Sequence, residues 1–265
     1  MTQDDAPTFP SLLQPAPGQG YRYNIDSFLL ARFARFRAGE RVCDLGAGVG
    51  VLSFLALLRG GVKEVSAVEI QENLADLALR NSETLDLKDK MTVFRASWKD
   101  VTKYLRKSSY DMVVSNPPYR KGKTGRLPPD SGKAAAKHEI DGTLADLVKA
   151  ARYLLKPSGR LCLMYPPLRL EELIVELHRI KMKLHRLAWV HPFADKPATL
   201  FMAEAVRSVP RELKVEAPVI VYQDPDRYMP DVEEWVGKKM SASVHERPGA
   251  VSPARPSRPL SDRPY

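Results

Sequence analysis

The sequence predicts a doubly wound α/β protein with a mostly parallel sheet. Three observations lead to this prediction: short apolar runs alternate with helical patterns, a glycine-rich turn follows the first run, and the last two strands have no helix between them. Helices between consecutive apolar strands are typical of crossover connections in a parallel sheet. The missing last helix predicts an antiparallel edge hairpin, and the sheet would have seven strands.

The elements follow in order from hydrophobic periodicity. Residues 26–36 place Phe28, Leu29, Phe33 and Phe36 on one side of a helix. The later apolar runs are short and bounded by turn residues, as buried strands are. Strands are expected over 41–45, 64–69, 91–95, 110–115, 160–165, 184–191 and 199–206, with helices over 51–58, 71–85, 144–155 and 168–180. Residues 156–159 (Lys-Pro-Ser-Gly) are typical of a turn, and residues 213–222 are expected to add an extended segment.

Composition and charge restrict the class of protein. The chain has 265 residues, 44% of them hydrophobic, which is enough for a sizeable core. Its two cysteines favour neither a disulfide framework nor a metal site. No apolar run approaches the roughly 20 residues of a membrane span, and the first residues lack a signal peptide, so we expect a soluble cytoplasmic protein. The net charge of +9 favours a polyanionic partner such as nucleic acid.

The first strand ends in Asp44-Leu-Gly46-Ala-Gly48-Val-Gly50. Glycines let the backbone turn sharply and approach a ligand at the N-terminus of the next helix, although a tight turn can need them for packing alone. The spacing is not the G-x-G-x-x-G of dinucleotide binding. Asp44 would repel a pyrophosphate but suit a ligand with an ammonium or sulfonium group, which disfavours a nicotinamide oxidoreductase.

Two further positions at strand ends extend this candidate site. Glu69 ends the second strand, where such folds place a carboxylate on a ribose diol. Ser97 follows the third strand, where an adenine edge of the ligand would be read, but a serine there can equally be a turn residue. The neighbouring Trp98 could instead cover the adenine face.

The fourth strand ends in Asn116-Pro117-Pro118-Tyr119. A conjugated amine is a poor nucleophile, and two acceptors aimed at its hydrogens, the Asn116 side-chain oxygen and the Pro117 carbonyl, would localise its lone pair. Pro118 would fix the turn, and Tyr119 offers a face for a flat substrate. A strand terminator is the alternative reading.

A basic loop follows this motif. It contains Arg120, Lys121, Lys123 and Arg126. Such residues often form a merely solvated face. Beside an amine pocket, they favour contacts with the phosphates of RNA.

These motifs resemble the class I S-adenosylmethionine-dependent methyltransferases of the amino-methylating group, with a Rossmann-like sheet. More narrowly, the chain is similar to the bacterial tRNA(Val) adenine-N6 methyltransferases, which modify the adenine 3′ of the anticodon. Supporting segments are residues 20–31, 137–140, 154–161, 189–192 and 219–222. The resemblance spans about residues 12–230. Ser97 departs from the aspartate of many relatives.

The resemblance implies S-adenosylmethionine as cofactor and tRNA as substrate. Asp44 and Gly46 would hold the methionine end, Glu69 the ribose, and residues 116–119 the target amine. Gly48, Gly50 and Asn116 would also border the cofactor, and Asp26 would lie over it or cap its helix. We expect residues 1–39 to cover the cofactor site, 40–236 to form the methyltransferase domain, and 237–265 to be a disordered Pro/Arg/Ser-rich tail.

Three other functions stay open. A glutamine-amide methyltransferase of the release-factor type uses the same motif, but it usually carries a helical domain before the glycine turn. Guanine-N2 RNA methyltransferases often have phenylalanine at the position of Tyr119. A non-catalytic RNA-binding protein on the same fold would not need Asp44, Glu69 and Asn116.

Overall fold

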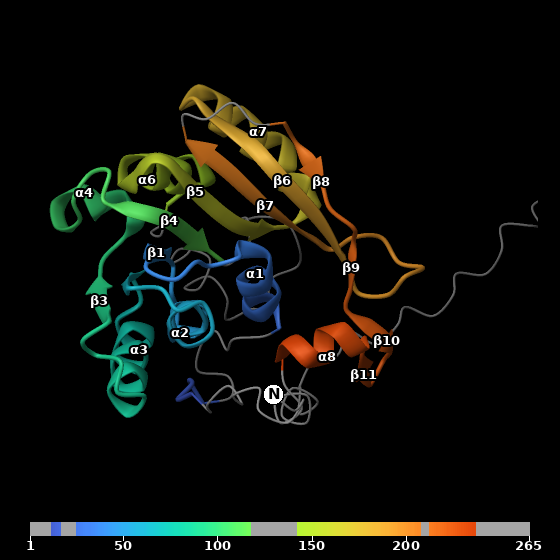
Figure 1. Ribbon diagram of the computed structural model, residues 1–265, viewed down its shortest axis with the longest axis horizontal. Helices are drawn as coiled ribbons and strands as arrows, with labels where there is room; N and C mark the ends of the chain where they lie inside the picture. Colours follow the sequence, from blue (N-terminus) through green and yellow to red (C-terminus); the bar gives the residue numbers. More distant parts are fainter. Residues whose placement is uncertain (1–11, 17–24, 118–141, 208–211, 237–265) are drawn as a thin grey trace, which may run out of the picture.

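One sheet of nine strands runs through the protein, with helices on both faces (Figure 1). The computed structural model describes residues 12–16, 25–117, 142–207 and 212–236. The sheet contains β1 (Arg41–Leu45), β2 (Glu64–Glu69), β3 (Met91–Arg95), β4 (Tyr110–Ser115), β5 (Leu155–Tyr165), β6 (Met182–His191), β7 (Leu200–Arg207), β8 (Lys214–Val215) and β9 (Val219–Ile220). A separate two-stranded sheet joins β10 (Tyr222–Asp224) to β11 (Arg227–Tyr228).

The strand order is β3-β2-β1-β4-β5-β7-β6-β8, and β9 also pairs with β6. The strands β3, β2, β1, β4 and β5 are parallel to one another, whereas β7 is antiparallel to both β5 and β6. The chain reverses direction across the sheet between β1 and β4, which is where ligands bind in doubly wound folds. The predicted fold class is therefore confirmed.

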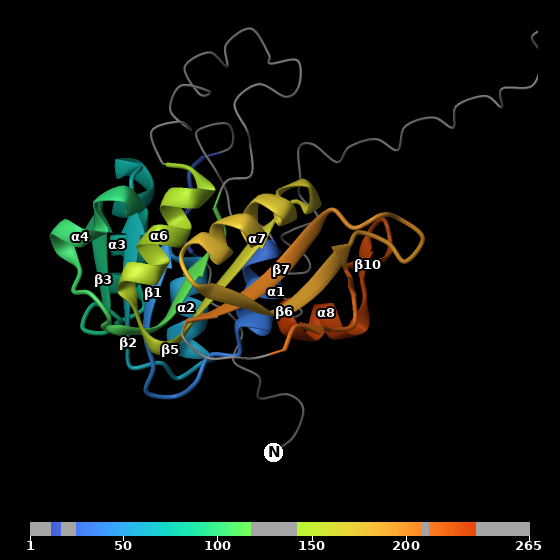
Figure 2. The same cartoon turned by 90° about the horizontal axis from the view of Figure 1, so that it is seen from above.

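Helices cover both faces of the sheet and create two hydrophobic cores. One core lies under α1 (Asp26–Ala34), α2 (Val51–Leu58), α3 (Glu72–Thr84) and α8 (Pro230–Val236). The other lies under η1 (Trp98–Asp100), α4 (Val101–Tyr104), α6 (Leu144–Leu154) and α7 (Leu170–Arg179), which follows the short η2 (Pro167–Arg169). Figure 1 shows α6 and α7 above the sheet with α1, α2 and α8 below it, and Figure 2 shows the same two layers from another side. Alternate residues of each buried strand supply the two cores, as in other sheets covered on both faces.

The elements agree with the sequence in most places. Strands β1 to β4 and helix α2 have the predicted bounds. The predicted hairpin is present as β6 and β7, but β7 inserts between β5 and β6, and the two short strands β8 and β9 extend the sheet beyond the predicted seven strands. Backbone pairing of these short segments with β6 is a tertiary contact that no local pattern indicates.

The predicted turn over residues 156–159 is a bulge inside β5. Leu155 lies opposite Tyr110 of β4, but the next partners are Arg160 and Met112, so β5 has extra residues at this place. Ser158 takes a left-handed conformation with φ of 64°. Proline and glycine interrupt the pairing, as expected, but the strand resumes in the same direction.

Helix α1 is fixed to the sheet through its C-terminal carbonyl groups. The last carbonyls of a helix lack partners within the helix, and cations near them are favourable. Arg160 Nη1 donates to the carbonyl oxygen of Ala34 at 3.0 Å, and Arg186 Nη2 donates to that of Phe33 at 2.7 Å. The Arg186 guanidinium also lies 4.2 Å from the centre of the Phe33 ring. Two strand arginines thus bind the end of this helix.

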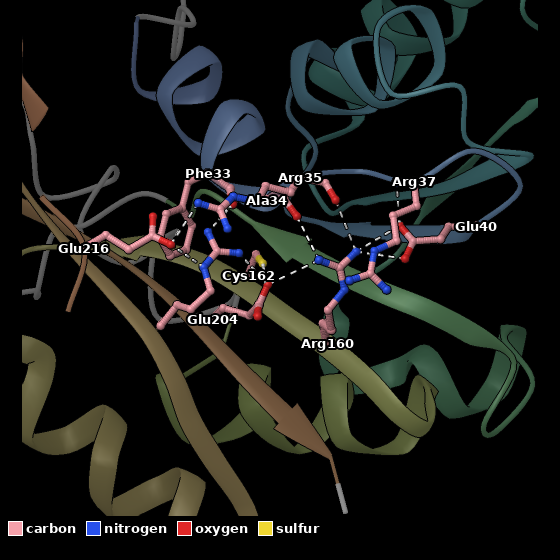
Figure 3. A network of polar contacts seen from close by, with 10 residues as sticks. Phe33, Ala34, Arg35, Arg37, Glu40, Arg160, Cys162, Glu204 and Glu216 are labelled. Atoms are coloured by element: carbon pink, nitrogen blue, oxygen red, sulfur yellow. Dashed lines mark hydrogen bonds and ion pairs between the residues drawn. The ribbon is translucent and has the colours of Figure 1, made fainter. Parts of the chain in front are cut away.

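Glu204 of β7 lies between the two arginines and completes a buried network (Figure 3). Its Oε2 accepts from Arg160 at 3.2 Å and from Arg186 at 3.0 Å, and its side chain is 3% exposed. Outer carboxylates pair with the same cations: Glu40 with Arg160 at 2.8 Å, and Glu216 with Arg186 at 2.8 Å. The network joins β5, β6 and β7 to α1.

The substitution Glu204→Gln should lower the free energy of unfolding by about 3 kcal/mol, because it leaves two buried guanidinium groups without their shared charge. Denaturant unfolding followed by circular dichroism measures this change. Glu72→Gln is the matched control, since Glu72 pairs with Arg95 on the surface, and it should change stability by less than about 0.5 kcal/mol. Equal effects of the two substitutions would contradict the assignment.

Candidate active site

Three of the predicted site residues stand at one edge of the sheet. Asp44 lies near the end of β1, Glu69 ends β2, and Asn116 directly follows β4. Asp44 is opposite Ala67 of β2 and Val114 of β4 in the parallel register. Because the carboxyl ends of parallel strands meet at one edge, the structure brings these residues to the switch point of the sheet.

The glycine turn has the backbone conformation that the sequence predicts. Gly46, Gly48 and Gly50 have φ of 80°, 56° and 92°, which is the region that favours glycine. A Cβ atom added to Gly50 would lie 2.7 Å from the ring of Phe54, so packing alone requires this glycine. One added to Gly48 would meet nothing within 4 Å. The turn is therefore closed toward the core and open at Gly48, where a ligand can approach the backbone.

Asp44 is a buried carboxylate beside this turn. It is 1% exposed, and Ser53 Oγ in the first turn of α2 donates a hydrogen bond to its Oδ2 at 2.7 Å. Burial raises the pKa of Asp44 to about 7, and the nearby Glu69 carboxylate adds to the rise, while the bond from Ser53 opposes it. Because ionisation of this buried carboxyl group is unfavourable, a cationic ligand beside it would stabilise the charged form. The ammonium or sulfonium group predicted from the sequence is such a ligand.

Glu69 holds the glycine turn through both oxygens of its carboxylate. Its Oε2 accepts from the backbone N–H of Gly48 at 2.8 Å, and its Oε1 accepts from that of Gln71 at 2.8 Å. The residue is buried. The carboxylate thus fixes the open glycine relative to the end of β2, a role that the sequence did not indicate.

Ser97 and Trp98 follow β3 and lie next to the turn. Ser97 caps η1, with its Oγ accepting from the N–H of Lys99 at 3.2 Å. Trp98 is buried, and a Cβ added to Gly46 would lie 3.3 Å from its ring. Ser97 thus has the turn role that the sequence left open, and the ring of Trp98 packs against the glycine turn at Gly46. Contacts of either residue with a ligand adenine stay a prediction.

The motif predicted to bind the amine begins directly after β4. Asn116 is partly exposed, and Pro117 is buried. The Asn116 Nδ2 donates to Ser27 Oγ of α1 at 3.3 Å. Pro118 and Tyr119, like Arg120, Lys121, Lys123 and Arg126, lie outside the described residues.

The N-terminal segment approaches the site through α1. Asp26 is the first residue of this helix and Ile25 is its N-cap, so Asp26 stands in the first turn and not at the capping position. Its neighbour Ser27 is 7% exposed and contacts Asn116. Ser27 is a site residue that sequence reasoning missed, because serine in a helix carries no signal of a partner 89 residues away.

A second missed residue, Asn81 of α3, joins the first described segment to the glycine turn. Its Oδ1 accepts from Leu13 N at 2.7 Å, and its Nδ2 donates to the carbonyls of Leu13 and Val49 at 3.1 and 3.2 Å. Asn81 is 2% exposed. A polar residue on the apolar side of a helix pattern is the signal that could have revealed it.

The substitution Asp44→Asn should stabilise the free protein at high pH. The folded-state pKa of Asp44, about 7, exceeds its usual 3.8, so the folded state binds the extra proton and loses stability as pH rises from about 4 to about 7. At about one kcal/mol or more per pKa unit, the gain for the variant reaches roughly 2–4 kcal/mol at pH 8 and vanishes near pH 4. Denaturant unfolding at the two pH values tests this expectation.

The exposed Asp89→Asn is the control for that measurement, and it should change stability little at either pH. A loss of stability in Asp44→Asn that is the same at both pH values would contradict the electrostatic explanation.

Comparisons with known proteins indicate the family of the chain. Residues 24–179 match the family model described as "Methyltransferase small domain". A tRNA1(Val) (adenine(37)-N6)-methyltransferase of Dyadobacter fermentans is 28% identical over 207 residues, covering 77% of this chain and 80% of the relative. One of the same name from Tolumonas auensis is 30% identical over 152 residues, covering 56% of this chain and 61%, under two thirds, of the relative.

A crystal structure of a predicted O-methyltransferase, Atu636 from Agrobacterium tumefaciens, superimposes with a TM-score of 0.62. It is 21% identical, and the match covers 80% of this chain and 95% of that one. At this identity the likeness shows the fold, which is that of a methyltransferase. Since the family model spans more than half of the sequence, the chain belongs to the methyltransferase small domain family.

Proposed function

We propose that this protein transfers a methyl group from S-adenosylmethionine to the exocyclic N6 amine of an adenine in tRNA. The observation that carries the proposal is the position of Asn116, at the end of β4 and next to the glycine turn that follows Asp44. An amide there can accept from an amine that is brought to a methyl donor at the turn. The names of the relatives, tRNA1(Val) (adenine(37)-N6)-methyltransferase, support adenine in tRNA as the substrate.

The residues around the turn suit the cofactor. S-adenosylmethionine, when bound, supplies an electrophilic methyl group. Asp44 offers a buried negative charge to the ammonium of the methionine end, and the open backbone at Gly48 admits close approach, with Gly46 and Gly50 shaping the turn. Glu69 would bind the ribose hydroxyls. Two further residues would complete the cofactor site, Ser97 beside the adenine and Asp26 above it.

The target amine needs acceptors more than it needs a base. Its lone pair is delocalised into the purine ring, so hydrogen bonds from its two hydrogens to the Asn116 side chain and the Pro117 carbonyl favour a pyramidal nitrogen. Tyr119 would stack on the adenine, as aromatic residues do on extruded bases, and Pro118 would orient the turn. The surplus proton can leave to water after transfer.

The basic residues after this motif would bind the phosphates of the RNA. Arg120, Lys121, Lys123 and Arg126 follow Tyr119 directly in the sequence. Cations that neutralise phosphates release counterions, so their contribution falls as salt rises. This contribution gives affinity and orientation without reading the sequence of the RNA.

The substitution Asn116→Ala should lower methyl transfer at least about 100-fold, because one acceptor of the amine is lost. The assay uses labelled S-adenosylmethionine with bulk unmodified tRNA, rRNA and a protein fraction containing Gly-Gly-Gln. Nucleoside analysis should find the label as N6-methyladenosine in tRNA. Cofactor affinity, measured by calorimetry, should fall far less than the rate of transfer.

Asn73→Ala is the matched control, because Asn73 is exposed on α3. Label on glutamine alone would indicate a release-factor type enzyme, and N2-methylguanosine would indicate a guanine enzyme; either result contradicts the proposal. Binding of RNA without any transfer would indicate a non-catalytic protein.

Replacing Arg120, Lys121, Lys123 and Arg126 together by alanine should weaken tRNA binding and reduce its salt dependence. Each lost phosphate contact lowers the slope of log K against log salt by about 0.7 to 0.9. Filter binding over a range of salt measures the slope. The control variant replaces four other exposed lysines by alanine. They lie before the amino ends of β2, β3 and β4, at the edge of the sheet opposite the proposed site: Lys63, Lys88, Lys90 and Lys107. An unchanged slope in the loop variant would contradict the proposed contact.

A further inference from the structure

The hydrogen bond between Asn116 and Ser27 assigns a role to the first helix. We propose that Ser27 is a positioning residue: its hydroxyl holds the amide nitrogen of Asn116 and thereby directs the amide oxygen at the target amine. This inference rests on the proposed function. The Asn116 Nδ2 lies 3.3 Å from Ser27 Oγ, and the two residues come from β4's end and from the first turn of α1.

The need for orientation follows from the chemistry of the carboxamide. One end of the Asn116 amide accepts hydrogen bonds and the other end only donates them. An amine has two hydrogens to donate, so the oxygen end stabilises it, whereas the reversed amide would place donors against donors. In the structure the Ser27 hydroxyl accepts from Nδ2, so α1 holds the nitrogen end of the amide and the oxygen end is turned away from Ser27. Donation from Nδ2 also polarises the amide, which makes its oxygen a better acceptor.

The position of Ser27 is itself fixed from both sides. Ser27 is 7% exposed, and the flanking Ile25 and Phe28 are buried in the core under α1. At the other end of the helix, Arg160 and Arg186 bind its last carbonyls. A positioning group must be held by its own supports to be effective, and α1 has such supports at both ends.

The test is the single-turnover rate constant for methyl transfer to tRNA at saturating cofactor. Ser27→Ala should slow this step about 10- to 100-fold, which is the range for a misplaced catalytic group, while thermal midpoint and cofactor affinity stay at their wild-type values. Ser27→Thr keeps the hydroxyl and should stay within about threefold of wild type. Ser82→Ala, at another buried serine, which lies in α3 and donates to the carbonyl of Leu79, is the control and should leave the rate unchanged.

A second test, in the Asn116→Asp variant, distinguishes an effect of Ser27 on the orientation of the amide from a general effect on the structure. The carboxylate of Asn116→Asp accepts at both ends, so it has no wrong orientation. In that background, Ser27→Ala should slow transfer less than about twofold, because no wrong orientation remains. About twofold is the usual scatter in such comparisons of variants. The same 10- to 100-fold loss in both backgrounds would show that Ser27 merely supports the structure and would overturn the inference.

Two single-variant results would also overturn it: Ser27→Ala as fast as wild type, or Ser27→Thr as slow as Ser27→Ala. These comparisons need no active Asn116→Asp enzyme. Failure of the proposed function looks different, since the wild-type protein would then place no methyl group on tRNA.

Discussion

The buried pairing of Glu204 with Arg160 and Arg186 is the interaction on which the rest of the structure depends. It binds the C-terminal carbonyls of α1 to β5, β6 and β7, and that helix has no backbone pairing with the sheet. Buried ion networks often add little net stability, because desolvation offsets their attraction. Their geometry is nevertheless specific, since each guanidinium group has fixed donor directions. The network therefore sets where α1 lies more than how stable the fold is.

The unfavourable burial of Asp44, near the carboxyl end of β1, has a different consequence. Asp44 is buried beside the Glu69 carboxylate, and the hydrogen bond from Ser53 only partly offsets this burial, so its ionised form is unfavourable in the free protein. A cation bound beside it removes that penalty. The cost of ionising Asp44 in the free protein would thus favour binding of a positively charged ligand. It would also disfavour anionic ligands such as a pyrophosphate.

The sequence predicted the parts of this protein that depend on local pattern. Apolar runs located β1 to β4, and the glycines, Asp44 and Asn116 located the ligand edge, because strand ends in a parallel sheet converge whatever the long-range details. It did not predict α8, whose few apolar residues stand among acidic ones. It also missed the contacts that join distant segments: Ser27 with Asn116, and Arg160 with Glu204. Their partners follow from tertiary packing, and no spacing along the chain indicates them.

These two sets of contacts lie at opposite ends of the same helix, and this has a consequence for the site. In the proposed site the motif after β4 supplies acceptors for an amine, but a carboxamide can present either end. The nitrogen end contacts Ser27, which precedes the first strand in the sequence, and Ser27 belongs to a helix that strand arginines bind at its far end. In the proposed mechanism the segment before β1 therefore takes part in the site, because it holds one end of the amide that binds the amine.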